Sequence, residues 1–192
     1  MVVETAWGFC AVSTHGAGLW SACLPQTSPQ VALQAAQIAD AAGDLRGLSC
    51  CPPVDDPPQS QVLRDAAELL RAYFQGAFSL QGACALQDMP LDLDDYTPFS
   101  RDVSLACARI APGELVTYGE LAAAVGSPGA SRAAGQVMAR NRLPLFVPCH
   151  RVIGAGGRLT GFGGGLALKA RLLEFEGRKV KSDNTGNWRI VG

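Results

Sequence analysis

The sequence predicts an α+β (α/β) protein of two domains, with a small β-sheet in the first and a helix-turn-helix in the second. Three observations support this prediction. Strand-like segments flank a Gly-rich turn near the N-terminus, capped helical patterns follow from Thr97 onward, and an acidic first half precedes a basic second half. We therefore expect a boundary after residue 96, giving domains 1–96 and 97–192.

The N-terminal domain opens with a predicted β-hairpin. Its strands are residues 9–12 and 19–24, and a turn at 15–18 with two glycines joins them. An Ala-rich stretch at 29–41 predicts a short helix. The Pro-rich segment 52–58 then predicts a loop, because proline interrupts helical hydrogen bonding.

A longer helix is predicted after that loop. Ser60 provides an N-cap, and an apolar stripe follows along one helical face. The stripe consists of Val62, Ala66, Leu69, Leu70 and Tyr73. Arg64, Glu68 and Arg71 fall away from it, so this helix is expected to bury one side only. Residues 77–96 then connect the domain to the next one.

The C-terminal domain begins with a helix that Thr97 caps and Pro98 starts. Four apolar residues at helical spacing predict its buried side. They are Val103, Ala106, Cys107 and Ile110. Pro112-Gly113 is expected to end this segment.

A helix-turn-helix pattern follows. A short strand at 115–117 leads into a helix at 118–125, a turn at 126–129 contains two glycines, and a second helix runs over about 130–139. The pattern is moderately specific, because paired helices are also common in proteins that bind no nucleic acid.

The second helix of this pair has an unusual composition. Its N-terminal side carries small residues and one large polar residue. These are Ala130, Ser131, Arg132, Ala133, Ala134 and Gly135. A helix that reads the major groove normally carries several polar side chains. A smooth helix suits a narrow minor groove instead, with Arg132 probing the base stack. The alternative is a helix packed on a neighbour, with Arg132 at the surface.

Charge separates the two halves of the chain. Residues 1–99 hold three basic and eleven acidic residues, a net of 3 − 11 = −8, whereas residues 100–192 hold thirteen basic and six acidic ones, a net of 13 − 6 = +7. A basic half in a chain of net charge −1 indicates a polyanionic partner. Two solubilising surfaces of opposite sign would explain the same numbers.

Composition also limits the location of the protein. No apolar run is long enough to span a membrane, and the first residues lack the basic region of a secretory signal. Seven cysteines without regular spacing argue against a disulfide framework. We therefore expect an intracellular, reducing location, cytoplasmic or nuclear, and no membrane partner.

Cys149 is the residue that indicates chemistry. Free cysteines are usually buried and inert, but Cys149 lies between Pro148 and His150 at the end of an apolar run. His150 and Arg151 are expected to raise the local positive potential and so to favour the thiolate. A thiolate attacks alkyl carbon well. His150 is expected to act through a bridging water, with a carboxylate orienting its ring.

A Gly-rich loop and a last helix follow. The loop Thr160-Gly161-Phe162-Gly163-Gly164-Gly165 lets backbone N–H groups approach a planar ligand, and Phe162 offers an apolar wall. It lacks the Lys and Ser/Thr of a phosphate-binding loop. A helix at 166–175 ends at Glu176-Gly177, where Gly177 suits the left-handed position. Glu176 is the candidate carboxylate for His150, although a solvated helix end is the simpler interpretation.

These motifs resemble the O6-alkylguanine-DNA alkyltransferases, a family of methylated-DNA–protein-cysteine methyltransferases. The run Pro148-Cys149-His150-Arg151-Val152 is highly specific for that family, and the similarity extends from about Thr97 to Gly177. The resemblance implies a ribonuclease-H-like N-terminal domain and a winged-helix-like C-terminal domain. It implies repair of double-stranded DNA by one irreversible transfer of an alkyl group from O6-alkylguanine, or O4-alkylthymine, after base flipping.

The resemblance also assigns roles to single residues. Cys149 matches the acceptor, which His150 and Glu176 activate, and Asn141 matches a residue that bridges the second helix and the acceptor segment. Tyr118 matches the proton donor to the departing guanine, and Arg132 matches the arginine that fills the gap left by the flipped nucleotide. The remaining DNA-binding matches are Ala130, Ser131, Ala133, Gly135 and Arg151. The substrate-pocket matches are Pro144, Val152, Phe162, Gly163 and Gly164, with the Cys149 and Val152 carbonyls reading the guanine amino group and the Gly163 N–H donating to O6.

This sequence also departs from the family. Phe162 stands where some members have Tyr, and Gly163 stands where they have Ser. Some members bind zinc in the N-terminal domain, but Cys10, Cys23 and His15 do not fall at the matching positions. We therefore expect no metal and no cofactor, and a monomeric protein. The tail after Gly177 has no usable match.

Three other functions compete with repair. A non-catalytic alkyltransferase-like protein would recognise the lesion only, but such proteins replace the acceptor that Cys149 provides. A cysteine hydrolase would pair Cys149 with His150, although sequence neighbours rarely form a direct dyad. A transcription factor would need base-reading side chains that the second helix lacks.

Overall fold

The computed structural model describes residues 1–40, 57–77, 85–183 and 186–191. It divides into two compact units, which we treat separately. The N-terminal unit comprises Met1–Asp94 and Arg142–Phe146, and the C-terminal unit comprises Asp95–Asn141 and Val147–Gly192. The chain thus passes from the second unit into the first between residues 141 and 147 and then returns.

A three-stranded antiparallel sheet forms the centre of the N-terminal unit. Its order is β1 (Val2–Thr5), β2 (Gly8–His15) and β3 (Gly18–Ala22). The predicted hairpin is confirmed by the pairing of β2 with β3, in which His15 lies opposite Gly18. The first strand was not predicted, because four residues of weak alternation become a strand only when β2 pairs with them.

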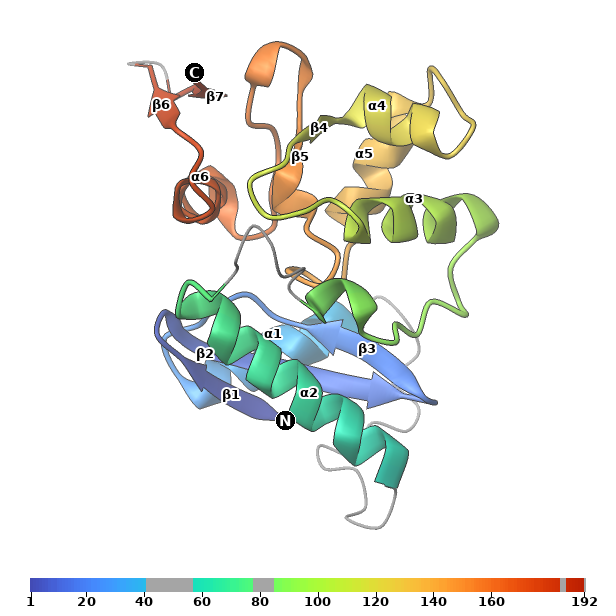
Figure 1. Ribbon diagram of the computed structural model, residues 1–192, viewed down its shortest axis with the longest axis vertical. Helices are drawn as coiled ribbons and strands as arrows, with labels where there is room; N and C mark the ends of the chain where they lie inside the picture. The colour runs from blue at the N-terminus through green and yellow to red at the C-terminus, as the bar shows by residue number, and fades with distance from the viewer. Residues whose placement is uncertain (41–56, 78–84, 184–185, 192) are drawn as a thin grey trace. The chain divides into compact units, whose positions relative to one another are not determined.

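Two helices cover the two faces of this sheet (Figure 1). On one face, Ala11 of β2 packs with Ala32 and Ala36 of α1 (Pro29–Asp40), which confirms the predicted short helix. Side chains alternate along a strand, so the buried neighbours of Ala11 point to the opposite face, where α2 (Pro57–Phe74) packs.

The second helix begins earlier than predicted. Its predicted apolar stripe is confirmed, since Val62, Ala66, Leu70 and Tyr73 are buried. The expected loop at 52–58 lies mostly outside the described residues, and its last two prolines start the helix instead of preceding it. The N-cap expected at Ser60 is therefore wrong. Proline is tolerated in a first helical turn, where no N–H partner is required.

The C-terminal unit has the predicted helices. α3 spans Pro98–Ala108, and the Thr97 hydroxyl accepts a hydrogen bond from the Ser100 N–H, as expected for an N-cap. α4 (Tyr118–Ala124) and α5 (Ser131–Ala139) form the helix-turn-helix, and both contact α3. A capping box between Thr117 and Glu120 fixes the start of α4.

Short strands and turns complete this unit. β4 (Val116–Thr117) pairs in parallel with β5 (Val152–Ile153), and α6 (Gly165–Phe175) follows the Gly-rich loop. Over the residues that the structure describes, short 3₁₀ helices are formed by Ala85–Asp88, Cys149–Arg151 and Ala155–Gly157. The parallel pair places the start of α4 beside the segment that carries Cys149.

An unpredicted hairpin closes the C-terminal unit. β6 (Val180–Ser182) pairs with β7 (Trp188–Ile190) in antiparallel register. Val180, Trp188 and Ile190 pack on a core cluster that Leu159, Ala170 and Leu173 form. The tail beyond Gly177 is thus a structured part of the unit, resting on α6.

Residues 142–146 group with the N-terminal unit because their side chains are buried there. Leu143, Leu145 and Phe146 are each at most 1% exposed. Arg142 stacks on Trp20, with its guanidinium carbon 3.5 Å from the ring centroid, and donates to the carbonyls of Trp20 and Asp92 at 2.9 Å each. These contacts hold the segment against β3 and against the residues that follow the 3₁₀ helix Ala85–Asp88.

The helices were compared with the requirements for spanning a membrane. Over the described ranges, none of them combines the length and the apolar character that crossing a bilayer requires.

Candidate functional site

A short 3₁₀ helix carries the predicted acceptor. The Cys149 N–H donates to the Val147 carbonyl at 2.7 Å, and the chain enters β5 directly after Arg151. The Cys149 side chain is buried, with 8% of the residue exposed. A backbone that turns tightly and then pairs with β4 therefore fixes the sulfur on a rigid support.

His150 and Glu176 form a buried pair behind Cys149. Nε2 of His150 lies 2.9 Å from Oε1 of Glu176, and both side chains are at most 1% exposed. The other ring nitrogen, Nδ1, is buried and has no hydrogen-bond partner among the described residues. The predicted pairing of these two residues is thus observed, although they lie 26 positions apart.

Arg151 completes this cluster instead of pointing to solvent. Its Nε and Nη2 donate to both carboxylate oxygens of Glu176, and its Nη1 donates to the Ile110 carbonyl. Only 3% of Arg151 is exposed. The expected contact of Arg151 with DNA is therefore not supported, because the side chain is buried and Glu176 and the Ile110 carbonyl hold its guanidinium inside the unit.

The charges of this cluster largely cancel. Burial alone would raise the pKa of Glu176, but hydrogen bonds and charges from His150 and Arg151 hold it well below its usual range. Burial lowers the pKa of His150 despite the Glu176 carboxylate. The arrangement at rest is an ionised Glu176, a cationic Arg151 and a neutral imidazole.

Cys149 is consequently a thiol at rest. Burial raises the pKa of Cys149, while hydrogen bonds from the Asn141 side chain and the Lys169 charge oppose this rise. The expectation that His150 and Arg151 favour the thiolate is corrected, because His150 is neutral and Glu176 neutralises Arg151. The proton must leave when the sulfur reacts.

Asn141 joins α5 to the acceptor segment, as expected for its position. Its Nδ2 donates to the Val147 carbonyl at 2.8 Å, and its side chain also hydrogen-bonds to Cys149. The Asn141–Val147 bond closes the base of the 142–146 loop. Pro144 lies within that loop and groups with the N-terminal unit, and its expected place in the substrate pocket stays a prediction.

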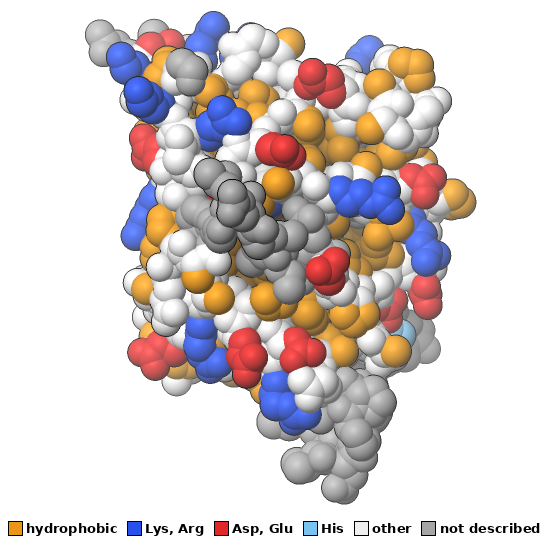
Figure 2. All heavy atoms as spheres, in the orientation of Figure 1, with side chains coloured by type: hydrophobic (Ala, Val, Ile, Leu, Met, Phe, Trp, Pro, Cys, Tyr) orange, Lys and Arg blue, Asp and Glu red, His pale blue; other side chains and the backbone are white. Residues whose placement is uncertain are grey.

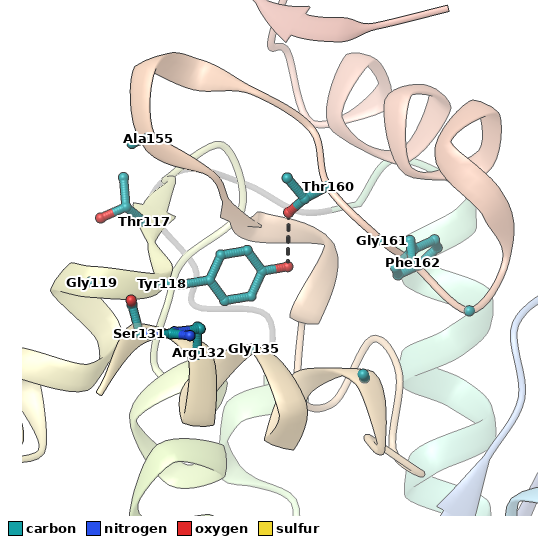
Figure 3. Close-up of a pocket in the computed structure, with 12 residues that line it drawn as sticks. Thr117, Tyr118, Gly119, Ser131, Arg132, Gly135, Ala155, Thr160, Gly161 and Phe162 are labelled. Carbon is teal, nitrogen blue, oxygen red and sulfur yellow. Dashed lines mark hydrogen bonds between the residues drawn. The ribbon is translucent and has the colours of Figure 1, made fainter. Parts of the chain in front are cut away.

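A pocket of about 800 Å³ lies between the helix-turn-helix and the Gly-rich loop (Figure 3). Six predicted site residues line it. These are Tyr118, Ser131, Arg132, Gly135, Phe162 and Gly163. Cys149 does not line this pocket, although a charge on its sulfur would raise the pKa of Tyr118, which does line it. The lining of this pocket therefore joins the helix-turn-helix to the Gly-rich loop without including the predicted acceptor.

Tyr118 occupies the middle of this pocket (Figure 3). Its hydroxyl accepts a hydrogen bond from Thr160 Oγ1 at 3.3 Å, and burial raises its pKa. Gly135 of α5 lies against the ring, since an added methyl would stand 3.7 Å from Tyr118 Cδ1. A small residue at 135 thus leaves room for the tyrosine to face the pocket.

The first turns of α5 present small side chains, with Arg132 exposed among them (Figure 3). Ala130, Ser131 and Ala133 are half-buried. Ala134 is fully buried, so its expected place on the exposed side is wrong: one position past Ala133, the helix has turned towards the core of the unit.

The Gly-rich loop provides the opposite side of the pocket. Phe162 is half-buried, and its ring meets the His150 ring edge-on with centroids 6.5 Å apart. Gly163 and Gly164 are exposed, and an added methyl at Gly163 would meet nothing within 4 Å. The loop therefore leaves its backbone accessible near Phe162.

Lys169 is the site residue that the sequence analysis missed. It is 0% exposed, and its Nζ donates to the Val152 carbonyl at 2.6 Å and the Thr160 carbonyl at 3.2 Å. Burial lowers its pKa to about 8, while Cys149 raises it. Helical periodicity could have indicated its burial, because Lys169 shares one face of α6 with Leu172, Leu173 and Glu176.

Two carbonyls expected to read the substrate already have one partner. The Val152 carbonyl accepts from Lys169, and the Cys149 carbonyl accepts from the Val152 N–H. Each carbonyl oxygen has two lone pairs, so each retains one for a ligand.

Metal binding has no support in the part of the chain that the structure describes. There, no three His, Cys, Asp or Glu side chains come close enough to hold an ion. His15 instead pairs with Asp92 at 2.7 Å. Cys50, Cys51 and Cys84 lie outside the described residues.

Comparisons with known proteins agree with this site. A family model for the DNA-binding domain of 6-O-methylguanine DNA methyltransferase matches residues 98–178. The methylated-DNA–protein-cysteine methyltransferase of Mycobacterium leprae is 42% identical over 129 residues, covering 67% of this chain and 73% of the relative. The protein of that name from Methanosarcina acetivorans is 42% identical over 118 residues, covering 61% and 70%.

Solved structures show the same similarity along most of the chain. Mycobacterium tuberculosis OGT, in a crystal structure with DNA, superimposes with a TM-score of 0.63 at 32% identity, covering 91% of this chain and 90% of that one. A crystal structure of the Mycobacterium tuberculosis O6-methylguanine methyltransferase gives a TM-score of 0.61 at 30% identity, with the same coverage.

Proposed function

Since the chain belongs to the family of methylated-DNA–protein-cysteine methyltransferases, we propose that it transfers an alkyl group from O6 of guanine in DNA to Cys149. O4-alkylthymine is the second substrate of this proposal. One observation carries it: a buried cysteine lies beside a His–Glu–Arg cluster, in the unit whose helix-turn-helix lines a pocket with Tyr118 and Arg132. The protein repairs DNA by direct reversal of the damage.

Proton movement follows from the charge states of the cluster. Nδ1 of His150 lacks a hydrogen-bond partner and can accept the thiol proton through a bridging water. Glu176 stabilises the imidazolium that forms, and Arg151 holds the carboxylate with two donors. His150 is thus the base, Glu176 orients it, and Arg151 positions Glu176.

The transfer itself exchanges one bond for another. The Cys149 sulfur bonds to the alkyl carbon, the bond between that carbon and O6 breaks, and guanine leaves with the bonding electron pair. Tyr118 donates a proton to the leaving guanine and recovers one from solvent. The thioether has no low-energy route back, so each molecule reacts once.

Small side chains on α5 suit close approach to the minor groove. The target base must leave the stack, which costs a few kcal/mol. Arg132, exposed at the pocket, is placed to fill the gap left by the flipped nucleotide. Phe162 and the accessible backbone at Gly163 then form a wall and a donor for the flipped base.

The finer details of the architecture belong to the same proposal. We assign residues 1–96 to a ribonuclease-H-like domain, supported by the sheet with helices on both faces. Residues 97–192 form a winged-helix-like domain with the acceptor site, supported by the helix-turn-helix and the β4–β5 pair. A protein that works on DNA with a free thiol fits a reducing, cytoplasmic location.

Intact mass measurement tests this function. The protein is incubated with duplex DNA that contains O6-methylguanine, and we expect a mass gain of one methyl group that maps to Cys149. Cys149→Ala should gain nothing. Cys107→Ala is the matched control, because Cys107 is a second buried thiol of the same unit and should leave the transfer intact. Adduct formation on Cys149→Ala, or none on the wild type, would overturn the assignment.

A further inference from the structure

The C-terminal hairpin has an apolar side and a basic side. Val180, Trp188 and Ile190 face the core on α6. Because side chains alternate along a strand, their neighbours point away from that core. Four exposed cations therefore share the outer side, which we call the basic face. They are Arg158, Lys179, Lys181 and Arg189.

Three of these cations form a row across neighbouring segments. Lys181 lies directly opposite Arg189 in the β6–β7 register, and Arg189 pairs in turn with Arg158 through an isolated antiparallel bridge. Directly opposed residues on neighbouring strands lie about 5 Å apart, and like charges at that spacing destabilise the pairing. The row therefore lowers the stability of the hairpin unless an anion binds to these side chains.

Among the described carboxylates, none forms an ion pair with this row. Across the described ranges, none of the four basic-face side chains has an ion pair. Asp183, at the hairpin turn, accepts hydrogen bonds from the backbone and side-chain amides of Asn187. Figure 2 shows the resulting concentration of Lys and Arg at its upper left, where Figure 1 places β6 and β7.

The basic face is continuous with the edge of the pocket. The Gly154 N–H donates to the Arg158 carbonyl at 2.7 Å, and the Leu159 N–H donates to the Trp188 carbonyl at 2.8 Å. Between Gly154 and Arg158 lies Ala155, which lines the pocket. Two hydrogen bonds thus connect one side of the pocket to the hairpin.

We infer that the basic face binds backbone phosphates of the DNA duplex beside the flipped nucleotide. This inference rests on the proposed function. Charge complementarity selects the occupant: a row of unpaired cations beside a DNA-facing pocket suits a regularly charged strand. The exposed side of the hairpin offers no large apolar anchor, which a protein partner would use. The hairpin thus extends the DNA contact beyond the helix-turn-helix.

Salt-dependent binding tests this contact. Affinity for an undamaged duplex is measured by fluorescence anisotropy at several salt concentrations, for the wild type and for Lys181→Gln/Arg189→Gln. Each phosphate contact contributes about 0.9 to the slope of log affinity against log salt. We expect the double variant to lose about 1 to 2 from that slope, together with a fall in affinity. The matched control, Arg109→Gln/Arg171→Gln, removes two exposed charges outside the basic face.

Two outcomes would overturn the inference. In the first, Lys181→Gln/Arg189→Gln binds DNA with the same affinity and the same salt slope as the wild type. The same result is expected if the basic face binds an acidic protein instead of DNA. The other is an equal loss in the control, which would indicate a diffuse effect of net charge. Methyl transfer to Cys149 is followed in parallel. A wild type that takes no methyl group from a duplex containing O6-methylguanine would contradict the proposed function, whereas the salt slopes would still show whether the basic face binds phosphates.

Discussion

Nε2 of His150 lies 2.9 Å from Oε1 of Glu176, and the carboxylate also receives two donors of the Arg151 guanidinium. The pair is fully enclosed, so the ionised carboxylate depends on these partners. The opposite ring nitrogen of His150 remains available for a proton. One hydrogen bond therefore connects the end of α6 to the chemistry at Cys149.

Glu176→Gln is expected to reduce both reactivity and stability. The amide cannot stabilise an imidazolium as a carboxylate does, and Arg151 would remain buried without a counter-charge. Breaking such a buried pair costs about 3–5 kcal/mol. Urea unfolding measures this loss, and the rate of reaction with free O6-benzylguanine measures the effect on the site. An unchanged rate in the folded variant would contradict the role of Glu176.

Acid sensitivity follows from the same residue. The pKa of Glu176 in the folded protein lies well below its usual range. Its stabilising contribution is therefore complete above the unfolded pKa of about 4.3 and is lost as the pH falls through the folded pKa. We expect the thermal midpoint to fall more steeply below pH 4.3 in the wild type than in Glu176→Gln. Parallel curves for the two proteins would refute the coupling.

Lys169→Met is expected to make Cys149 less reactive. The Lys169 charge opposes the burial that raises the pKa of the thiol. A change of one pKa unit alters the thiolate fraction tenfold, and a loss of about that size is expected at neutral pH. The pH–rate profile with free O6-benzylguanine should move to higher pH. A lower rate without a shifted profile would indicate a role for Lys169 in packing alone.

Arg132→Ala is expected to slow repair in duplex DNA more than reaction with the free base. The arginine acts on the base stack, which free O6-benzylguanine does not have. The ratio of the two rates, at saturating DNA, isolates this effect. Arg109→Ala, an exposed arginine at the end of α3, should leave the ratio unchanged. If Arg132→Ala slowed both reactions by the same factor, a role of Arg132 in base flipping would be contradicted.

Arg142→Ala is expected to destabilise the N-terminal unit. It removes a buried guanidinium from the Trp20 ring and leaves two carbonyls without their donor. A desolvated cation–π contact alone contributes about 2 kcal/mol. Urea unfolding, followed by tryptophan fluorescence, should show a loss of at least this size. Arg71→Ala, an exposed arginine on α2, is the control and should change little.

Local sequence signals predicted much of this fold. Thr97 and Pro98 marked the start of α3, and the stripe from Val62 to Tyr73 marked α2. Capping residues and helical periodicity act within a few positions, so a single sequence displays them. The identity of the site came from the resemblance around Cys149, and the distance between His150 and Glu176 could not be read from spacing.

Features that depend on distant partners were missed. The strands β1, β6 and β7 are short, and each requires a neighbouring strand to form. Arg151 was assigned to DNA binding, because its partners inside the unit, Glu176 and the Ile110 carbonyl, are 25 and 41 positions away in the sequence. Lys169 was overlooked because a lysine on an apolar face is expected to reach solvent, whereas here two carbonyls hold it inside.

The stoichiometry of transfer shows whether Cys149 is consumed by a single reaction. An excess of duplex DNA containing radiolabelled O6-methylguanine is added to a known amount of protein, and the label on the protein is followed to completion. Consumption of Cys149 predicts one methyl group per protein molecule, with no further removal from DNA and no label on Cys149→Ala. Continued demethylation beyond one equivalent would show that the thiol is regenerated and would contradict the irreversible consumption of Cys149.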